Sequence, residues 1–410
     1  MKQRLVAWAG FAGVLSAAGL PIYIHAPKFY VDAYGVSLSA LGGVLFALRF
    51  LDVVQDPLLG RLAARLRHWR ALSVGVAASF MAAGMLGLFA VEPPIAPLWW
   101  FALTLTLVFS AFSFLTIAFY ASGVAKAATL GGAGHIRLAR WRETGALLGV
   151  CIAAMLPTVF QSMGPSEFPA FAGFAVTFAL ATGLAVFGMR KEWSASAPPK
   201  ATGFGVVLRD APARRLLLIA FVNAAPVAVS SNLFLFFVES RLEATGMEGP
   251  LLLLFFLAAA VAAPIWGLVA EKWGAKPALL TAMVLSIAAF SGALGLGAGD
   301  TVLFALVCLG SGAALGADMT LLPAIFAARL SRIAPAATEG FALWAFVSKF
   351  TLAFAAVALL PVLEMQGFKA GTENSASALW SLSLLYAGVP CMLKLVAIGL
   401  LVATRIEETE

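Results

Sequence analysis

The sequence predicts an all-α protein that crosses a membrane many times. Of its 410 residues, 62% are hydrophobic and only 11% are charged, and the mean hydropathy is +0.96. A soluble domain carries about 25% charged residues. A chain with so few charges cannot hide its apolar surface in a core of its own. We therefore expect the lipid bilayer to solvate most of it.

Twelve apolar runs are long enough to cross a bilayer as helices, which takes about 20 apolar residues each. The predicted spans 1 to 12 are residues 4–27, 38–62, 71–91, 97–122, 143–163, 168–189, 214–238, 249–271, 276–297, 301–327, 340–363 and 378–403. The first run is longer than the core of a typical signal peptide, so we expect it to be retained as a span.

The positive charges are divided unevenly between the connecting loops. If the N-terminus lies in the cytoplasm, 21 of the 27 Lys and Arg residues lie on the cytoplasmic side, three in outside loops and three within spans. Cytoplasmic loops are normally enriched in these residues. The pattern predicts both termini in the cytoplasm of a bacterial-type inner membrane. It attributes the net charge of +7 to topology rather than to nucleic-acid binding.

The residue types needed for most cofactor chemistry are missing from the sequence. Cys151, Cys308 and Cys391 lie in apolar runs without paired spacing, so a disulfide framework or a structural metal site is not expected. The sequence has no P-loop motif and no Cys/His cluster. We therefore expect no cofactor and no enzymatic activity.

The two halves of the chain resemble each other. Six spans in residues 1–189 precede a polar cytoplasmic linker at 190–213, and six spans follow in 214–410. Span 2 ends in DPLLGRLAARLRHWR and span 8 in APIWGLVAEKWGAKP, which share the pattern P-x-x-G. Two parallel halves of six spans are the plan of the major facilitator fold, which places binding sites near the membrane midplane. We therefore predict that fold.

Span 2 carries three charges in the stretch RFLDVVQDPLLG, which begins at Arg49. A charge at the centre of a membrane helix costs about 2.5–3.5 kcal/mol, so a function is the first hypothesis. Asp52 and Asp56 are one helical turn apart, and Arg49 and Gln55 lie close to the same face. Carboxylate and amide oxygens suit Na⁺, and two repelling carboxylates also suit a proton. The alternative is a structural Arg49–Asp52 pair, with Asp56 capping a helix broken at Pro57.

Three further charges lie deep in the C-terminal half. Lys349 is about ten residues into span 11, near the midplane at about 1.5 Å per residue, where it needs a partner such as Asp52 or Asp56. Lys394 in span 12 is also deep. Asp318 lies about two turns from the inner end of span 10, where it either joins a cavity or pairs with a loop arginine. For each of them, a static charge pair is the alternative to a role in transport.

The motif of span 2 resembles the signature of a known family. The pattern R-x-x-D-x-x-(N/Q)-D-P-x-x-G is similar to that of the glycoside–pentoside–hexuronide:cation symporters, which include melibiose-permease-like members. RWRETGALLG before span 5 and LWAFVSKF in span 11 also fit that family. The resemblance implies a cation site for Na⁺, H⁺ or Li⁺ at Asp52, Asp56, Gln55 and Ser113.

The resemblance also implies substrate contacts. It assigns Arg142, which would otherwise be an ordinary interfacial charge, to the substrate, and it places Lys349 near both sites. Sugar-binding members of the melibiose type carry aspartates at the positions of Ser16 and Thr116, and their absence here argues against a galactoside. Tyr120 lies one turn beyond Thr116 and is a further candidate contact.

We therefore expect a monomeric, cation-coupled symporter that carries a small polar, sugar-like solute by alternating access. Its charge partners are expected at Arg49, Lys349, Asp318 and Lys394, and the only metal expected is a coupling Na⁺ at Asp52 and Asp56. The same residues also fit an H⁺-coupled exporter or a transporter of lysolipids or other amphiphiles. A non-transporting sensor or a lipid scramblase is a third class.

Overall fold

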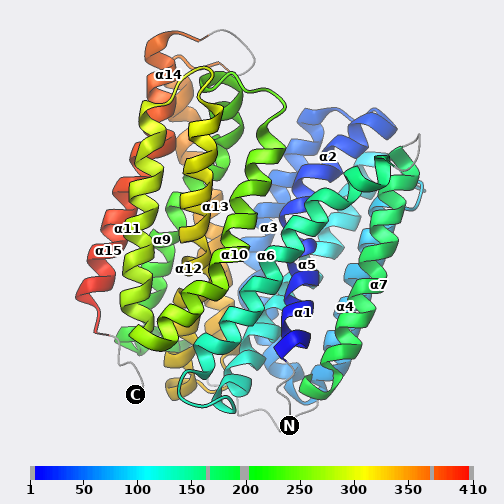
Figure 1. Cartoon of the computed structure of the whole chain (residues 1–410). Helices are drawn as coiled ribbons and strands as arrows, with labels where there is room; N and C mark the ends of the chain where they lie inside the picture. The colour runs from blue at the N-terminus through cyan, green and yellow to red at the C-terminus, as the bar shows by residue number, and fades with distance from the viewer. Residues whose placement is uncertain (1–4, 163–166, 194–202, 370–373, 406–410) are drawn as a thin grey trace. The chain divides into compact units, whose positions relative to one another are not determined.

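The computed structural model describes residues 5–162, 167–193, 203–369 and 374–405, without the side chains of residues 20–24, 28, 38–39, 49, 167, 353, 356–357 and 360–361. In this part of the chain every regular element is a helix (Figure 1). The helices are α1 (Leu5–Ala17), α2 (Leu20–Tyr34), α3 (Leu38–Arg65), α4 (Arg70–Phe89), α5 (Pro97–Ala128), α6 (Gly134–Ser162), α7 (Glu167–Trp193), α8 (Phe204–Arg209), α9 (Ala211–Phe236), α10 (Glu248–Trp273), α11 (Ala275–Ser291), α12 (Thr301–Ile333), α13 (Thr338–Met365), α14 (Ala376–Ser383) and α15 (Val389–Ala403).

Nine segments of the described chain are long and apolar enough to cross a membrane. One of them, Ala40–Phe89, covers the predicted spans 2 and 3, and α1 is a shorter apolar helix. Such a set of helices is typical of an integral, multi-pass membrane protein. The count of twelve spans and the cytoplasmic position of both termini stay predictions.

Span 1 is interrupted, whereas the sequence predicted one continuous run. α1 ends at Ala17 and α2 begins at Leu20. The amides of Ala18 and Gly19 bond to carbonyls only three residues earlier. Pro21 follows and has no amide hydrogen to continue the helical pattern. The local sequence G-L-P therefore separates two helices inside one apolar run.

Span 2 is continuous at its proline, so the alternative of a helix broken there is wrong. α3 runs from Leu38 to Arg65 with Pro57 inside it. A proline removes one helical hydrogen bond, and membrane helices tolerate this loss where neighbouring groups compensate for it. Asp56 therefore lies within an unbroken helix rather than capping one.

Contacts divide the chain into two compact units. Unit 1 comprises Met1–Thr129, Trp141–Val207 and Leu330–Phe346, and unit 2 comprises Leu130–Arg140, Leu208–Arg329 and Val347–Glu410. The segment that opens α6 thus belongs to unit 2, and the segment that opens α13 belongs to unit 1, although the sequence places each in the other half. The division into two six-span halves stays a prediction.

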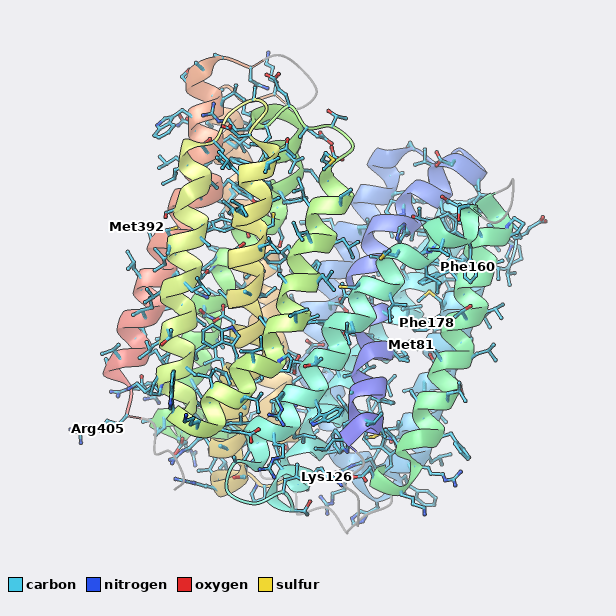
Figure 2. All side chains as sticks on the ribbon, in the orientation of Figure 1. Met81, Lys126, Phe160, Phe178, Met392 and Arg405 are labelled. Carbon is cyan, nitrogen blue, oxygen red and sulfur yellow. The ribbon has the colours of Figure 1, made fainter. Side chains whose placement is uncertain are left out.

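In unit 1, α4 packs against α5 and α7, α3 packs against α5, and α1 packs against α7. Met81 of α4 and Phe178 of α7 are both buried inside this unit (Figure 2). Aromatic rings fill part of the interior, where Phe89 stacks on Phe171 with ring centroids 5.3 Å apart. Apolar and aromatic contacts thus hold the helices that carry the charged residues of span 2.

In unit 2, α15 packs against α9 and α11, and α10 packs against α11. The interior contains Phe237 and Tyr386, whose rings stack with centroids 4.2 Å apart. Both residues belong to single π-helical turns, Phe237–Arg241 after α9 and Leu384–Gly388 between α14 and α15. The second turn makes α14 and α15 parts of one continuous segment, Ala376–Ala403.

α15 has an outer and an inner side. Met392 is 64% exposed on the outer side (Figure 2), whereas Lys394, two residues later, is buried. Two residues correspond to about 200° around a helix, so these side chains point in nearly opposite directions. The apolar side chain thus faces outward while the charged one faces the interior of unit 2.

Candidate functional site

The carboxylates of span 2 lie in unit 1, where α3 packs on α5. Asp52 is 8% exposed, and Asp56 is fully buried. The Gln55 side-chain amide donates to Asp52 at 2.6 Å, and the Ser110 hydroxyl of α5 donates to the Gln55 oxygen at 2.9 Å. The Ser113 hydroxyl donates to Asp56. The structure therefore brings together all four residues predicted for the cation site.

Helix geometry explains how these groups meet. Asp52 and Asp56 are one turn apart on α3, and Ser110 and Ser113 are three residues apart on α5, so each pair shares one helix face. A buried carboxylate without partners would lose the solvation that water supplies, and these hydrogen bonds offset part of that loss. The cluster of carboxylate, amide and hydroxyl oxygens has the composition that hard cations prefer.

The structure does not test the charge partners predicted for this cluster. The side chain of Arg49 lies outside those that the structure describes. Lys349 is half-buried on α13 and belongs to unit 2, whereas both carboxylates belong to unit 1. The pairing predicted for each of these two residues therefore stays a prediction.

A second polar cluster of unit 1 joins α5 to α6. Arg142 is 4% exposed and Glu143 is 1% exposed, so neither is an ordinary interfacial charge. The Arg142 Nε donates to Glu143 Oε1 at 2.7 Å, and the Tyr120 hydroxyl donates to the same oxygen at 2.8 Å. The guanidinium of Arg142 lies over the Tyr120 ring, 3.7 Å from its centroid. Glu143 thereby holds two of the predicted substrate residues together.

The two clusters share helix α5. Ser113, Thr116 and Tyr120 follow one another at intervals of three and four residues, which places them along one face. At about 1.5 Å per residue, Ser113 and Tyr120 are roughly 10 Å apart along the axis. The buried hydroxyl of Thr116 has no hydrogen-bond partner among the described residues. Ser16, the remaining predicted substrate residue, lies in the last turn of α1.

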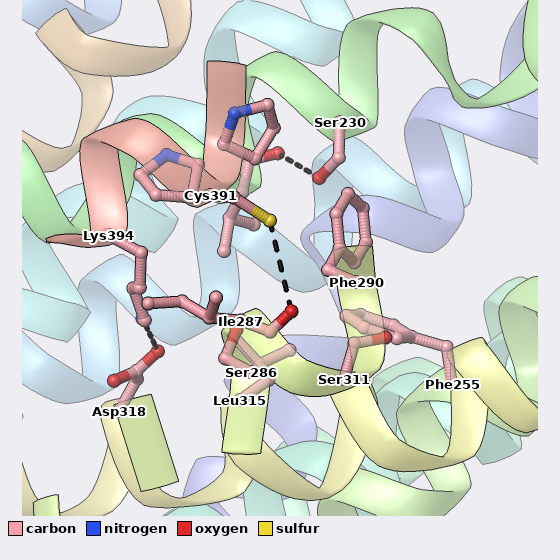
Figure 3. Close-up of a pocket in the computed structure, with 13 residues that line it drawn as sticks. Ser230, Phe255, Ser286, Ile287, Phe290, Ser311, Leu315, Asp318, Cys391 and Lys394 are labelled. Carbon is pink, nitrogen blue, oxygen red and sulfur yellow. Dashed lines mark hydrogen bonds and ion pairs between the residues drawn. The ribbon is translucent and has the colours of Figure 1, made fainter. Parts of the chain in front are cut away.

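In unit 2, Asp318 and Lys394 form an ion pair with each other. Lys394 Nζ contacts Asp318 Oδ2 and donates to the Asn223 side-chain oxygen at 2.7 Å. Asp318 therefore does not pair with a loop arginine. Both Lys394 and Asp318 line a pocket within this unit (Figure 3). This position matches the other alternative for Asp318, that it joins a cavity.

Three residues complete these clusters although the sequence did not single them out as site residues: Ser110, Glu143 and Asn223. Glu143 had a usable signal, because a carboxylate beside a deep arginine suggests a pair. Serine and asparagine side chains commonly bond to the backbone of their own helix, so their presence in a span does not indicate a functional site. No group of three His, Cys, Asp or Glu residues in the described part of the chain could hold a metal ion.

A family comparison covers nearly the whole chain. The family model described as MFS/sugar transport protein matches residues 6–408. A comparison with curated proteins gives no significant match.

Solved transporters share the architecture. The human organic anion transporter MFSD10 (TETRAN) matches with a TM-score of 0.66 at 18% identity, over 98% of this chain and 100% of that one. A bacterial homologue of the iron transporter ferroportin, outward-facing with soaked iron, gives 0.70 at 12% identity over 98% and 99%. The E. coli fucose:proton symporter FucP gives 0.66 at 15% identity over 96% and 98%. At these identities the likeness shows a common fold and not a common substrate.

Proposed function

The chain belongs to the MFS/sugar transport protein family, and on this premise we propose that it is a cation-coupled symporter of a small polar solute. The family and the solved neighbours make it a multi-pass membrane protein and a secondary transporter of the major facilitator superfamily, not an enzyme. Symport, the identity of the ion and the class of solute are the proposed part.

One observation carries the proposal. Two carboxylates one helical turn apart, Asp52 and Asp56, are buried in unit 1 and accept hydrogen bonds from a neutral amide and a neutral hydroxyl. Two negative charges repel each other strongly where the dielectric constant is low. A bound Na⁺ or H⁺ reduces that repulsion. We therefore assign cation binding to this pair, with Gln55 and Ser113 as additional oxygen ligands.

The second cluster is our proposed substrate contact. Arg142 and Tyr120 are held by one oxygen of Glu143, which orients a guanidinium and a hydroxyl for a polar solute. Sugars and small acids both offer groups that such a pair recognises, and the family resemblance favours a sugar-like solute. The aspartates of melibiose-type members are replaced by Ser16 and Thr116, which argues against a galactoside.

Coupling follows from the helix that the two clusters share. A cation at Asp52 and Asp56 changes the hydrogen bonds of Ser110 and Ser113 on α5, and Tyr120 lies further along the same face. A shift of α5 on ion binding would therefore move Tyr120, whose ring and hydroxyl help to hold Arg142 in place. In the alternating-access cycle, the loaded site is closer to neutral than the empty one. Ion binding therefore lowers the cost of closing the loaded carrier.

Ion binding can be tested without knowing the solute. Thermal unfolding of the purified protein is compared in Na⁺, Li⁺ and choline salts for the wild type, Asp52→Asn and Asp56→Asn. The control is Asp300→Asn, a loop aspartate that accepts a bond from the Gly297 amide. A ligand that binds only the folded state raises the free energy of unfolding by about 2.7 kcal/mol when its concentration is a hundred times its Kd. We therefore expect Na⁺ or Li⁺ to raise the Tm of the wild type and of the Asp300→Asn control, but not that of the Asp52→Asn and Asp56→Asn variants.

The outcomes separate the two candidate ions. If the coupling ion is H⁺, Na⁺ has no effect, and the response of the Tm to acid weakens in Asp56→Asn. If Na⁺ raised the Tm equally in the wild type and in both site variants, Asp52 and Asp56 would not be the ion-binding site. Once a solute is known, Asp56→Asn should equilibrate it without accumulating it, and full ion-driven uptake by that variant would contradict the coupling role.

A further inference from the structure

The ion pair of unit 2 lies deep in its helices and shares no residue with the proposed cation site of unit 1. Lys394 of α15 contacts Asp318 of α12 (Figure 3). It also donates to the side-chain oxygen of Asn223 on α9. Asp318 lies near the middle of the 33-residue helix α12. The side chains of Lys394 and Asp318 are 3% and 10% exposed. A charge at such a place is costly, so the pair calls for a physical explanation.

The two oxygens of Asp318 differ in their surroundings. Oδ2 contacts the Lys394 ammonium, whereas Oδ1 is buried and has no hydrogen-bond partner among the described residues. The free-energy cost of moving a charged pair out of water is offset only when the remaining lone pairs also accept hydrogen bonds. A purely structural ion pair would be expected to satisfy both oxygens. The open oxygen therefore points to an exchangeable partner.

The pocket beside the pair can supply that partner as water. Its volume is about 40 Å³, and a single water needs about 10–15 Å³ on this measure. Ser230 and Ser311 on its walls donate to the carbonyls of Val227 at 3.2 Å and Val307 at 2.6 Å. Their oxygens remain available as acceptors. Roughly two or three waters can therefore occupy the pocket and reach Asp318 Oδ1 with polar partners of their own.

The charges that face Asp318 across this pocket come from one residue. Lys394 is the only other charged side chain among the lining residues, and Cys391 is the only other titratable one. The remaining lining residues, which come from α9, α10, α11, α12 and α15, are uncharged. Asn223, which bonds to Lys394, is neutral as well. Lys394 is thus the charged neighbour of Asp318 at this pocket.

We propose that Asp318 is a second proton-binding site of this transporter, supplied by the waters of the pocket and gated by Lys394. A hydronium in the pocket transfers its proton to Asp318 Oδ1, so that an O–H bond forms on the carboxyl and a neutral water remains. The carboxyl loses its charge and with it the electrostatic attraction to Lys394. Lys394 then keeps only the neutral Asn223 oxygen as a partner.

The consequence is a coupling between proton binding and helix packing. An ammonium without a counter-charge is unfavourable in a low-dielectric interior. Protonation of Asp318 therefore favours an arrangement in which α15 carries Lys394 away from α12 and towards water. Deprotonation restores the pair and the packing. The site goes beyond the proposed symport function, because it uses none of the residues of the span-2 cluster.

Infrared difference spectroscopy of the purified protein, acidic minus neutral, reads carboxyl protonation directly. We expect a protonated-carboxyl component in the wild type that is lost in Asp318→Asn and retained in the double variant Asp52→Asn/Asp56→Asn.

A matched control guards against misfolding. Asp318→Asn leaves Lys394 buried without a counter-charge, so the double variant Asp318→Asn/Lys394→Met removes both charges and serves as the folded reference. The proposal is overturned if either Asp318 variant keeps the full set of carboxyl components. Loss of the component in the Asp52→Asn/Asp56→Asn protein instead would assign the proton to the span-2 cluster, and Asp318 would be a static partner of Lys394.

Discussion

At the scale of single residues, each buried carboxylate of the chain is best understood through its donors. Asp56 accepts from Ser113 of α5, and Asp318 accepts from Lys394 of α15. The two sites thus differ in one donor that each carboxylate has, a hydroxyl at Asp56 and an ammonium at Asp318.

Ser113→Ala tests the hydroxyl as a cation ligand. Hydrogen bonds to charged groups are worth about 1.5–3 kcal/mol, and part of this value applies to the ion-bound state. We expect cation affinity to fall by about tenfold, or ~1.4 kcal/mol, as measured by the salt dependence of thermal unfolding. Ser122→Ala is the matched control, because Ser122 is buried on the same helix and donates to the Ala118 carbonyl. Equal losses in both variants would contradict a role for Ser113 as a ligand.

Asp210 gives a prediction of pH dependence outside the spans. Its carboxylate caps α9 by accepting from the Ala213 amide at 2.8 Å, and it accepts from Arg329 at 3.0 and 2.5 Å. The hydrogen bonds from Arg329 hold the pKa of Asp210 below its ordinary value. A lowered pKa stabilises the folded state at pH values above the ordinary Asp pKa of about 3.9, and this stabilisation fades as the pH falls further.

The measurement is the Tm of wild type and Asp210→Asn across pH. Asparagine also caps helices, so the variant removes mainly the ion pair. We expect the wild type to have the higher Tm near neutral pH and the gap to close below about pH 4. The Arg329→Lys variant keeps the charge but not the two-point contact, so its Tm near neutral pH should lie between those of the wild type and Asp210→Asn. A gap that is constant over the whole range would assign the effect to something other than the charge of Asp210.

The sequence predicted some of these residues and missed others for a physical reason. Asp52, Asp56 and Gln55 lie within one turn of a single helix, so their spacing alone places them together. The partnership of Asp318 with Lys394 joins residues that are 76 positions apart, and no local pattern encodes it. Glu143 was visible as a neighbour of Arg142, but its burial depends on how α6 packs and not on its own sequence.

At the scale of helices, small residues decide which pairs can approach closely. Gly145 and Gly149 of α6 face the backbone of α1 at Ala9 and Gly13. This pattern of small residues four positions apart on both helices allows backbone contact, as is common where membrane helices cross. The pair α1–α6 is thus held by close packing rather than by charges.

Gly149→Ala tests this crossing. A Cβ at Gly149 would lie 2.6 Å from Gly13 Cα, and backbone cannot yield as a flexible side chain does. Overpacking of this kind costs about 1–3 kcal/mol, so we expect a lower Tm and a lower yield of folded protein. Gly10→Ala, on α1 with no atom near the added Cβ, should leave the Tm unchanged or slightly raised. Equal behaviour of the two variants would exclude a tight α1–α6 crossing.

Helix boundaries show the limit of hydropathy. The apolar composition predicted where spans lie, because burial in lipid depends on average hydrophobicity. It did not predict the break between α1 and α2, and it left open whether the helix of span 2 breaks at Pro57, because these details depend on single backbone hydrogen bonds. The π-helical turns beside α9 and α15 are of the same kind.

At the scale of the whole molecule, the repeated P-x-x-G of spans 2 and 8 acquires a structural meaning. Gly60 faces Ala342 of α13 within unit 1, and Gly267 faces Arg140 of α6 within unit 2. A Cβ at either glycine would overlap its neighbour. Arg140 also pairs with Glu271 at 3.0 Å. The N-terminal parts of α13 and α6 thus pack on α3 and α10, each from the other half of the sequence.

The topology of the chain is the prediction on which every statement about sides of the membrane rests. The uneven distribution of Lys and Arg places the loop before α9 in the cytoplasm and the loop after it outside. Arg209, the last residue of α8, and Glu243 are exposed residues of these two connections. With Cys151, Cys308 and Cys391 replaced by alanine, single cysteines at these positions can be labelled by a membrane-impermeant maleimide.

In sealed right-side-out vesicles we expect Glu243→Cys to be labelled and Arg209→Cys to be protected, with the reverse in inside-out vesicles. Epitope tags at both ends of the chain should be reached only in inside-out vesicles, because an even number of crossings returns the chain to its starting side. Labelling of both cysteines from one side would mean that α9 does not cross the membrane. Tags on opposite sides would leave an odd number of spans, and the plan of two six-span halves would fail.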